Sequence, residues 1–388
     1  MQVAKPKVVV VLGLMGCIPV AGTGMAWNTI QHLVGLRRLG YDVYYVESTG
    51  IWPFNAIADD CTFPVTYIST LLSRFGFEGK WAYVAAHSDG RCYGLSELQV
   101  KALYERADAI VNLFGGTVLR EEHLQCPIRI YLETDPVVHQ IHIANGEHKY
   151  IDLVGAHTAL FSWGENYGEP DCGVPTAPFV YQGTRPPVVL DHWATPCDPT
   201  ARRFTTVAHW DQSAKDLEYN GERYSWSKHL EFLKVLALPQ RTTQEFSLAL
   251  AIDDHAAVRL LKAHGWEVED AYDASKTLES YREYIWRSRG EFTVAKDMNV
   301  RLRSGWFSER SAAYLAAGKP VITQETGFSK FLPTGMGLYA FRVLDDIPPA
   351  VEAINSDYQK HSNAAKEIAA EYFDAEKLLR RLMRSAGL

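Results

Sequence analysis

A run of five apolar residues, Val8 to Leu12, constrains the fold of this chain more than any other feature. A continuous β-branched run of this kind is typical of a parallel strand that is buried on both faces. A glycine-bearing loop follows from Gly13 to Gly24, and then a helical pattern that ends at Gly40. A second strand is predicted from Val43 to Val46. Together these segments form the repeating unit of an open α/β sheet.

Further strands are predicted in two series, with helical patterns between them. The two series are separated by a stretch rich in proline and polar residues, 184–203, which predicts a linker. A length of 388 residues suits two domains. We therefore expect two Rossmann-like domains in tandem at 1–190 and 203–355, and C-terminal helices at 356–388 that pack back toward the first domain. The predicted strands are Ile110–Phe114, Ile128–Leu132, Ala159–Phe161 and Phe179–Tyr181 in the first series, and Phe204–Val207, Phe246–Ile252, Phe292–Val294, Val321–Thr323 and Leu338–Phe341 in the second.

Composition narrows the class of protein. Apolar residues make up 47% of the chain and charged residues 22%, as in a folded protein rather than a disordered one. The net charge is −7 without a long basic run, which argues against nucleic acid as a partner, although a local basic cleft is compatible with an acidic protein. The six cysteines lack paired metal or redox spacing, and no apolar run is long enough to span a membrane. These features predict a cytoplasmic protein with reduced thiols.

The stretch 303–331 carries most of the functional information. Ser308 is predicted to cap a helix at Glu309–Ala317, and Gly318 supplies its left-handed end. A capped helix start in an α/β sheet presents free N–H groups and the positive end of the helix dipole, which suits a diphosphate. Arg310 adds a cation in the first turn, where it is unfavourable unless an anion lies nearby.

The segments Gly305-Trp306-Phe307-Ser308 and Leu315-Ala316-Ala317-Gly318-Lys319-Pro320 resemble the nucleotide-sugar signature of GT-B glycosyltransferases. The C-terminal half is also similar to poorly characterised bacterial members of that group. The resemblance implies a GT-B fold with a cleft between two Rossmann-like domains. It further implies that the second domain holds a nucleoside-diphosphate sugar as donor substrate, with no bound cofactor and no obligatory metal.

The resemblance also implies roles for particular residues. Ser308 falls on the diphosphate-binding serine. The ribose-binding glutamate is replaced by Ser311, and Glu309 is the candidate to substitute for it. The paired glutamates of many retaining members fall at Gly305 and Ala313, which cannot act as acids. The turn expected near the donor sugar comprises Gln324, Glu325, Thr326 and Gly327.

Three cations outside that segment are candidates for the departing diphosphate, because preorganised positive charge stabilises a leaving group that gains charge. Arg223 and Lys228 match, by position, the arginine and lysine that retaining GT-B enzymes use. Lys296 follows the predicted strand at Phe292–Val294 and is therefore expected at the carboxyl edge of the sheet. Lys228 is the better candidate of the first two, and an ordinary surface charge is the alternative for Lys228 and Lys296.

The N-terminal half offers fewer candidates. Gly22 and Gly24 would let the backbone approach a ligand closely. Glu133 and Asp135 follow the strand at Ile128–Leu132 and are the candidate catalytic bases, although Asp135 precedes a proline and also suits a turn. The acceptor pocket is expected from the loop after Gly13 and from two aromatic-rich loops, Trp52–Thr66 and Trp81–Tyr93.

The sequence therefore predicts a glycosyltransferase that moves a hexose or pentose from a nucleotide sugar to a small-molecule or glycan acceptor. Three alternatives stay open. These are a nucleotide-sugar 2-epimerase of the same fold, a glycosyltransferase acting on a modified nucleic-acid base, and an inactive nucleotide-sugar-binding subunit. The identity of the acceptor, the stereochemistry and the oligomeric state are left open.

Overall fold

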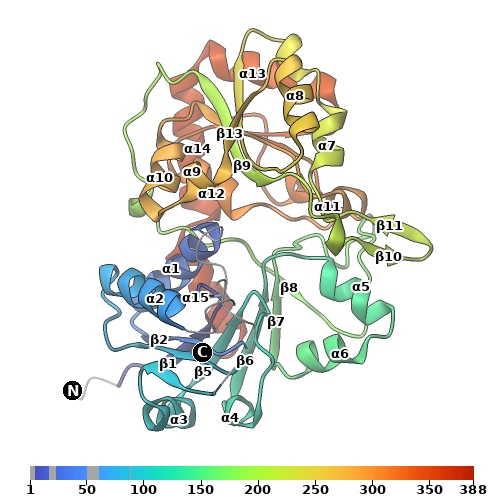
Figure 1. Ribbon diagram of the computed structural model, residues 1–388. Coiled ribbons are helices and arrows are strands. Elements are labelled where there is room, and N and C mark those ends of the chain that lie inside the picture. Colours follow the sequence, from blue (N-terminus) through green and yellow to red (C-terminus); the bar gives the residue numbers. More distant parts are fainter. Residues whose placement is uncertain (1–4, 17–22, 50–60, 88) are drawn as a thin grey trace.

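The computed structural model describes residues 5–16, 23–49, 61–87 and 89–388. Two sheets form two lobes, and the linker and the C-terminal helices join them (Figure 1). The first sheet has the strand order β4-β3-β2-β1-β5-β6-β7-β8, with β4 antiparallel to β3 and the other strands paired in parallel. Its strands are β1 (Val8–Leu12), β2 (Asp42–Glu47), β3 (Trp81–Val84), β4 (Cys92–Gly94), β5 (Ala109–Leu113), β6 (Ile128–Glu133), β7 (Ala159–Ser162) and β8 (Gln182–Gly183).

The strand β1 is the centre of this lobe because its residues are apolar on both faces. Val9 and Val11 belong to the core on one side of the sheet, and Val8 and Val10 to the core on the other. The first helix ends near Gly40, whose φ of +91° fits the predicted glycine stop. The helices of this lobe are α1 (Thr23–Arg38), α2 (Thr62–Arg74), α3 (Glu97–Arg106), α4 (Glu121–Leu124), α5 (Val138–Ala144) and α6 (His148–Gly155).

The second sheet is parallel throughout, with the order β13-β12-β9-β14-β15-β16. Its strands are β9 (Arg203–His209), β12 (Glu245–Ala251), β13 (Glu267–Asp270), β14 (Gly290–Thr293), β15 (Val321–Gln324) and β16 (Leu338–Phe341). A separate hairpin, β10 (Leu217–Tyr219) and β11 (Glu222–Tyr224), extends toward α5 of the first lobe (Figure 1). The helices are α7 (His229–Lys234), α8 (His255–Ala263), α9 (Ala271–Ser275), α10 (Leu278–Trp286), α11 (Asp297–Arg301), α12 (Glu309–Ala316), α13 (Ile347–Ser356), α14 (Tyr358–Tyr372) and α15 (Ala375–Ser385).

The chain crosses between the lobes twice, and the two crossings are bonded to each other. The N–H of Val188, in the first crossing, donates to the carbonyl of Phe373 in the second over 2.7 Å, and the N–H of Ala375 donates to the carbonyl of Val188 over 2.9 Å. Beyond this point α15 packs on α1. A Cβ on Gly35 of α1 would lie 2.6 Å from Leu379 Cδ1, so the close approach of these two helices requires a glycine.

Some expectations about elements need correction. The strand expected at Phe179–Tyr181 is wrong, because pairing with β7 begins only at Gln182. The segment expected as an aromatic acceptor loop contains the strands β3 and β4, and Trp81 and Tyr83 of β3 are buried in the core of the first lobe. Residues Gly22, Trp52 and Phe54, also expected near ligands, lie outside the described residues. No helix in the ranges that the structure describes is long and apolar enough to cross a membrane.

Candidate functional site

A cavity of about 600 Å³ lies between the lobes, at the carboxyl ends of strands from both sheets. Its N-terminal wall is formed by the start of α1 and the segments after β1, β5, β6 and β7. Its C-terminal wall is formed by the end of β9, the segment around Lys228, the start of α9 and the start of α12. Parallel α/β sheets place ligand sites at this edge. The cavity brings together eight of the predicted site residues: Gly24, Glu133, Asp135, Lys228, Lys296, Ser308, Glu309 and Arg310.

Ser308 caps α12 as its position predicts. Its Oγ accepts a hydrogen bond from the Arg310 N–H over 3.2 Å, which satisfies one of the amides at the helix start. Glu309 occupies the first position of the helix, and Gly24 of α1 lies opposite it, since a Cβ built there would be 3.5 Å from Glu309 Oε1. The start of α12 therefore faces the start of α1 across the cavity.

Arg310 is held more tightly than the sequence indicates. Its Nε donates to Glu291 of β14, and its terminal nitrogens donate to the Val207 carbonyl over 2.8 Å and to Thr293 Oγ1 over 3.0 Å. Burial alone would lower the pKa of Arg310, but the Glu291 carboxylate outweighs that effect and keeps the pKa above its ordinary value. The expected unpaired cation is thus a buried ion pair that fixes α12 to the sheet, with two N–H groups left for other partners.

Lys228 is a buried cavity cation that has no carboxylate partner among the described residues. Only 8% of the residue is exposed, and its ammonium lies 5.8 Å from the centroid of the Trp306 ring. No ion pair joins it to an acid anywhere in the described ranges. Burial, with a smaller contribution from the nearby Arg310, lowers the pKa of Lys228 to about 7. A buried ammonium with so low a pKa is stabilised by any anion that enters the cavity.

Lys296 and Asp135, predicted separately as a cation and a base, bind each other across the cavity. The Lys296 Nζ donates to both Asp135 carboxylate oxygens over 2.6 Å, and it lies 3.2 Å from the centroid of the Trp226 ring. Burial lowers the pKa of Lys296, and Asp135 opposes that effect. The pair joins the segment after β6 to the segment after β14, so it also connects the two lobes.

Glu133 is buried at the end of β6. One carboxylate oxygen accepts from Gln140 Nε2 over 2.9 Å, and the other accepts from Ser162 Oγ over 2.6 Å and from the Tyr167 hydroxyl over 3.2 Å. Burial raises the pKa of Glu133 to about 7 in spite of these donors. A carboxyl group with this pKa can give or take a proton near neutral pH.

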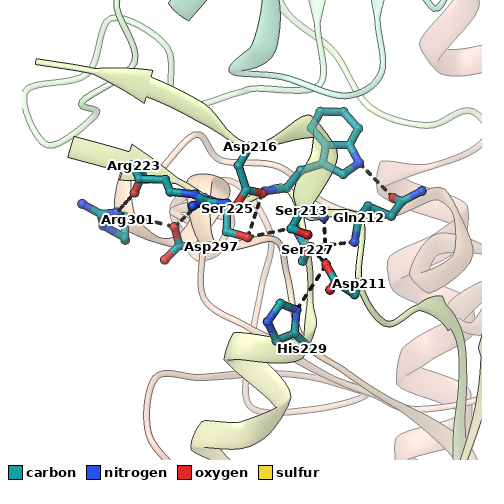
Figure 2. A network of polar contacts seen from close by, with 11 residues as sticks. Asp211, Gln212, Ser213, Asp216, Arg223, Ser225, Ser227, His229, Asp297 and Arg301 are labelled. Atoms are coloured by element: carbon teal, nitrogen blue, oxygen red, sulfur yellow. Dashed lines mark hydrogen bonds and ion pairs between the residues drawn. The ribbon is translucent and has the colours of Figure 1, made fainter. Parts of the chain in front are cut away.

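Arg223 does not line the cavity. It lies on the hairpin strand β11, where its guanidinium pairs with Asp216 over 2.9 Å (Figure 2). Asp216 also accepts from the Trp226 N–H over 2.9 Å, and Trp226 Nε1 donates to Gln212 Oε1 over 3.0 Å. This placement corrects the expectation that Arg223 faces a leaving diphosphate. The network instead holds the hairpin and positions Trp226 at the cavity.

The turn after β15 also lies behind the cavity wall rather than on it. The Thr326 hydroxyl donates to the Trp306 carbonyl over 2.6 Å, and the Gly305 N–H donates to the Thr326 carbonyl over 2.7 Å. These bonds brace the loop that leads to Ser308, which corrects the expectation of direct contact with a donor sugar. The remaining predicted residues of this turn, and Ser311, are also enclosed by protein. Gln324 bonds to Glu231 and to the Ala295 N–H, and Glu325 accepts from the Gly327 N–H. Gly327 lies against Asn166, and Ser311 is fully buried inside α12.

Several cavity residues were not predicted. His209 is the last residue of β9, and Trp163 follows β7 directly, so the rule that ligands lie at strand ends could have identified both. Lys215 lines the cavity from the segment that leads into the hairpin, and nothing in its local sequence indicates this. Among the residues that the structure describes, no cluster of three or more His, Cys, Asp or Glu side chains could hold a metal ion.

Comparison with solved structures identifies the fold. Anabaena HepE in complex with UDP-glucose superposes with a TM-score of 0.56 at 11% identity, over 97% of this chain and 98% of that one. AviGT4, a glycosyltransferase involved in avilamycin A biosynthesis, gives 0.55 at 10% identity, over 98% and 97%. An α-glucosyltransferase in complex with UDP and a 13-mer DNA containing an HMU base gives 0.55 at 10% identity, over 99% and 100%.

These neighbours share the GT-B fold, so the predicted fold class of two Rossmann-like units with a cleft between them is confirmed. No protein-family model matches the sequence, and no curated protein matches it. At about one identical residue in ten, the structural similarity establishes the architecture alone.

Proposed function

We propose that this GT-B protein transfers a sugar from a nucleoside-diphosphate donor, and that the diphosphate binds between Lys228 and the start of α12. The observation that carries the proposal is the buried Lys228 ammonium, which has no carboxylate partner among the described residues and lies beside a capped helix start in a cavity of about 600 Å³. That volume lies within the range of small-molecule sites. Complexes of two structural neighbours with UDP or UDP-glucose support a uridine diphosphate donor.

Each group on the C-terminal wall has a task in this proposal. Lys228 and the free amides at the start of α12 bind the diphosphate and stabilise the charge that it gains as the glycosidic oxygen departs. Lys296 adds a second cation, whose charge Asp135 balances in the unliganded protein. Arg310 acts as a positioning residue, because its bonds to Glu291 and Thr293 fix the helix start.

Glu133 is the proposed proton acceptor for the acceptor hydroxyl. It is buried in the N-terminal wall, and its pKa of about 7 lets it act as a base near neutral pH. Asp135 is less suited to that task because its carboxylate is bound to Lys296. The absence of an acidic side chain at Gly305 or Ala313 leaves the stereochemistry open.

An incubation of the protein with radiolabelled UDP-glucose, with and without a pool of glycosides and sugars, tests the proposal. We expect UDP release that depends on an acceptor, together with a labelled product heavier than the donor sugar. An epimerised donor formed without acceptor would instead indicate a 2-epimerase. Binding of UDP with no turnover of UDP-glucose or other UDP-sugars would indicate an inactive subunit, and turnover only with DNA containing modified bases would indicate a nucleic-acid acceptor.

A further inference from the structure

The two walls of the cavity differ in charge: the C-terminal wall has four cationic side chains against two acidic ones, Asp270 and Glu309, whereas the N-terminal wall has acidic side chains and no lysine or arginine among the described residues. Every lysine and arginine that lines it in the described part of the chain comes from the C-terminal wall: Lys215, Lys228, Lys296 and Arg310. The N-terminal wall contributes two carboxylates, Glu133 and Asp135, and one histidine, His139. Burial lowers the pKa of His139 to about 4, so it carries no charge at neutral pH. Segments 17–22 and 50–60, which the structure does not describe, contain no lysine, arginine or histidine in their sequence.

The N-terminal wall also presents two buried polar atoms without partners. Trp163 Nε1 and Asn28 Oδ1 have no hydrogen bond to the described residues, although both residues line the cavity and are 2% and 4% exposed. An unpaired buried donor or acceptor costs about 1–3 kcal/mol, so a ligand hydroxyl that reached either atom would supply a bond that the described residues leave unmade. A hydroxyl group can accept from the indole N–H and donate to a carbonyl or carboxylate oxygen.

The remainder of this wall is apolar. Leu14 follows β1, Met25 lies in the first turn of α1, Phe114 follows β5 and Val138 begins α5. Because these side chains line the same wall as Trp163 and Asn28, the wall matches a molecule with hydroxyl groups on a largely apolar or aromatic surface.

We propose that the acceptor is an uncharged hydroxyl compound with an apolar or aromatic face, and that phosphorylated and other anionic acceptors are excluded. This inference rests on the proposed donor site, because a diphosphate that occupies the cationic wall leaves the N-terminal wall for the acceptor. A phosphate on that wall would lie near the Glu133 carboxyl, and the cation nearest to Asp135, Lys296, is already paired with the Asp135 carboxylate at 2.6 Å. Like charges in a partly buried site repel, so an anionic acceptor is disfavoured there.

In the transfer step one bond forms, one bond breaks and Glu133 takes the released proton. The acceptor oxygen forms a bond to the anomeric carbon of the donor, the bond from that carbon to the diphosphate oxygen breaks, and the acceptor proton passes to Glu133. The negative charge stays on the nucleoside diphosphate, on the side of Lys228. An acceptor that is neutral before the step therefore adds no charge to the N-terminal wall.

The test measures binding to the wild-type protein that has first been saturated with UDP. The probes are 4-nitrophenyl β-glucoside and the same compound carrying a phosphate on its 6-hydroxyl, compared by calorimetry. We expect the neutral glucoside to bind at least about tenfold more tightly than its phosphate ester. The variant Trp163→Phe, which removes the indole N–H and keeps an aromatic ring, should weaken the neutral glucoside severalfold, with UDP binding as the check on folding.

Equal or tighter binding of the phosphate ester would overturn the inference, and so would failure of the UDP-loaded protein to bind the neutral glucoside. These failures are distinguishable from failure of the donor site. If neither UDP nor any other common nucleoside diphosphate binds in the first titration, the proposed function is wrong, and the acceptor inference falls with it.

Discussion

At the scale of single residues, the surroundings of Lys228 change its protonation, because burial lowers its pKa to about 7. Its ammonium is buried beside Arg310 and 5.8 Å from the Trp306 ring, with no ion-pair partner among the described residues. A pKa near 7 means that the side chain is mostly neutral at pH 8 in the unliganded protein. A bound diphosphate favours the charged form, so ligand binding and proton binding are coupled at this residue.

This coupling predicts the pH dependence of nucleotide affinity. Between pH 7 and pH 9 the charge of UDP is constant, because its terminal phosphate titrates near pH 6. Lys228 must take up a proton to pair with it, so we expect UDP affinity to fall by up to about tenfold per pH unit above 7. Calorimetry in two buffers of different ionisation enthalpy should show close to one proton taken up at pH 8. UDP binding that takes up no proton at pH 8 would contradict this account of Lys228.

At the scale of elements, α12 and the two segments beside it form the base of the donor wall. The local signals for this helix are strong, and the sequence predicts its Ser308 cap and its Gly318 end correctly. The sequence does not predict which neighbouring residues face the cavity. The turn at 324–327 has the polarity of a sugar-binding turn, but its partners Trp306, Ala295 and Asn166 come from distant parts of the chain. The spacing of residues along the chain does not indicate which side chains will be buried by elements far away in the sequence.

Gly305 shows how tightly the loop before α12 is fixed. Its φ is +82°, and a Cβ at this position would lie 2.4 Å from the Asn166 N of the first lobe. We expect Gly305→Ala to lower the free energy of unfolding by about 2–4 kcal/mol, because left-handed backbone strain adds to an overlap that the neighbouring backbone cannot relieve. Urea denaturation measures the loss.

The matched control is Gly221→Ala in the β10–β11 hairpin. Gly221 has a φ of +76°, but a Cβ added to it would meet no atom within 4 Å, so this variant reports backbone strain alone, about 1 kcal/mol. Equal losses in the two variants would show that the contact with Asn166 does not constrain the loop.

At the scale of the whole molecule, the site exists only because two lobes meet. The Lys296–Asp135 pair and the hydrogen bond from Trp306 Nε1 to the Thr134 carbonyl, at 3.1 Å, cross the cavity. The sequence predicts the tandem α/β architecture because buried strands have a local signature. It cannot predict that Lys296 and Asp135 are partners, because they are 161 positions apart and belong to different sheets.

Because Asp135 balances the charge of Lys296, we expect removal of the Asp135 carboxylate to raise the affinity for a nucleoside diphosphate. Asp135→Asn leaves Lys296 without a carboxylate, so the donor wall becomes more positive. We expect UDP to bind about two- to fivefold more tightly, an effect of the size of a partly exposed charge pair. Asp345→Asn, which removes an exposed carboxylate that pairs with Arg241 and does not line the cavity, is the control and should leave UDP affinity unchanged. Weaker UDP binding by Asp135→Asn would show that the pair assembles the site rather than restrains it.

The most direct measurement of the central claim is a calorimetric titration of UDP into three proteins: wild type, Lys228→Met and Lys262→Met. Lys262 is an exposed lysine in the last turn of α8, away from the cavity, and its replacement controls for the loss of one positive charge. If the diphosphate binds beside Lys228, Lys228→Met should weaken UDP binding by at least about tenfold, as loss of a charge-assisted hydrogen bond does, while Lys262→Met binds like wild type. Equal UDP affinity in all three proteins would contradict the assignment of this cavity as the donor site.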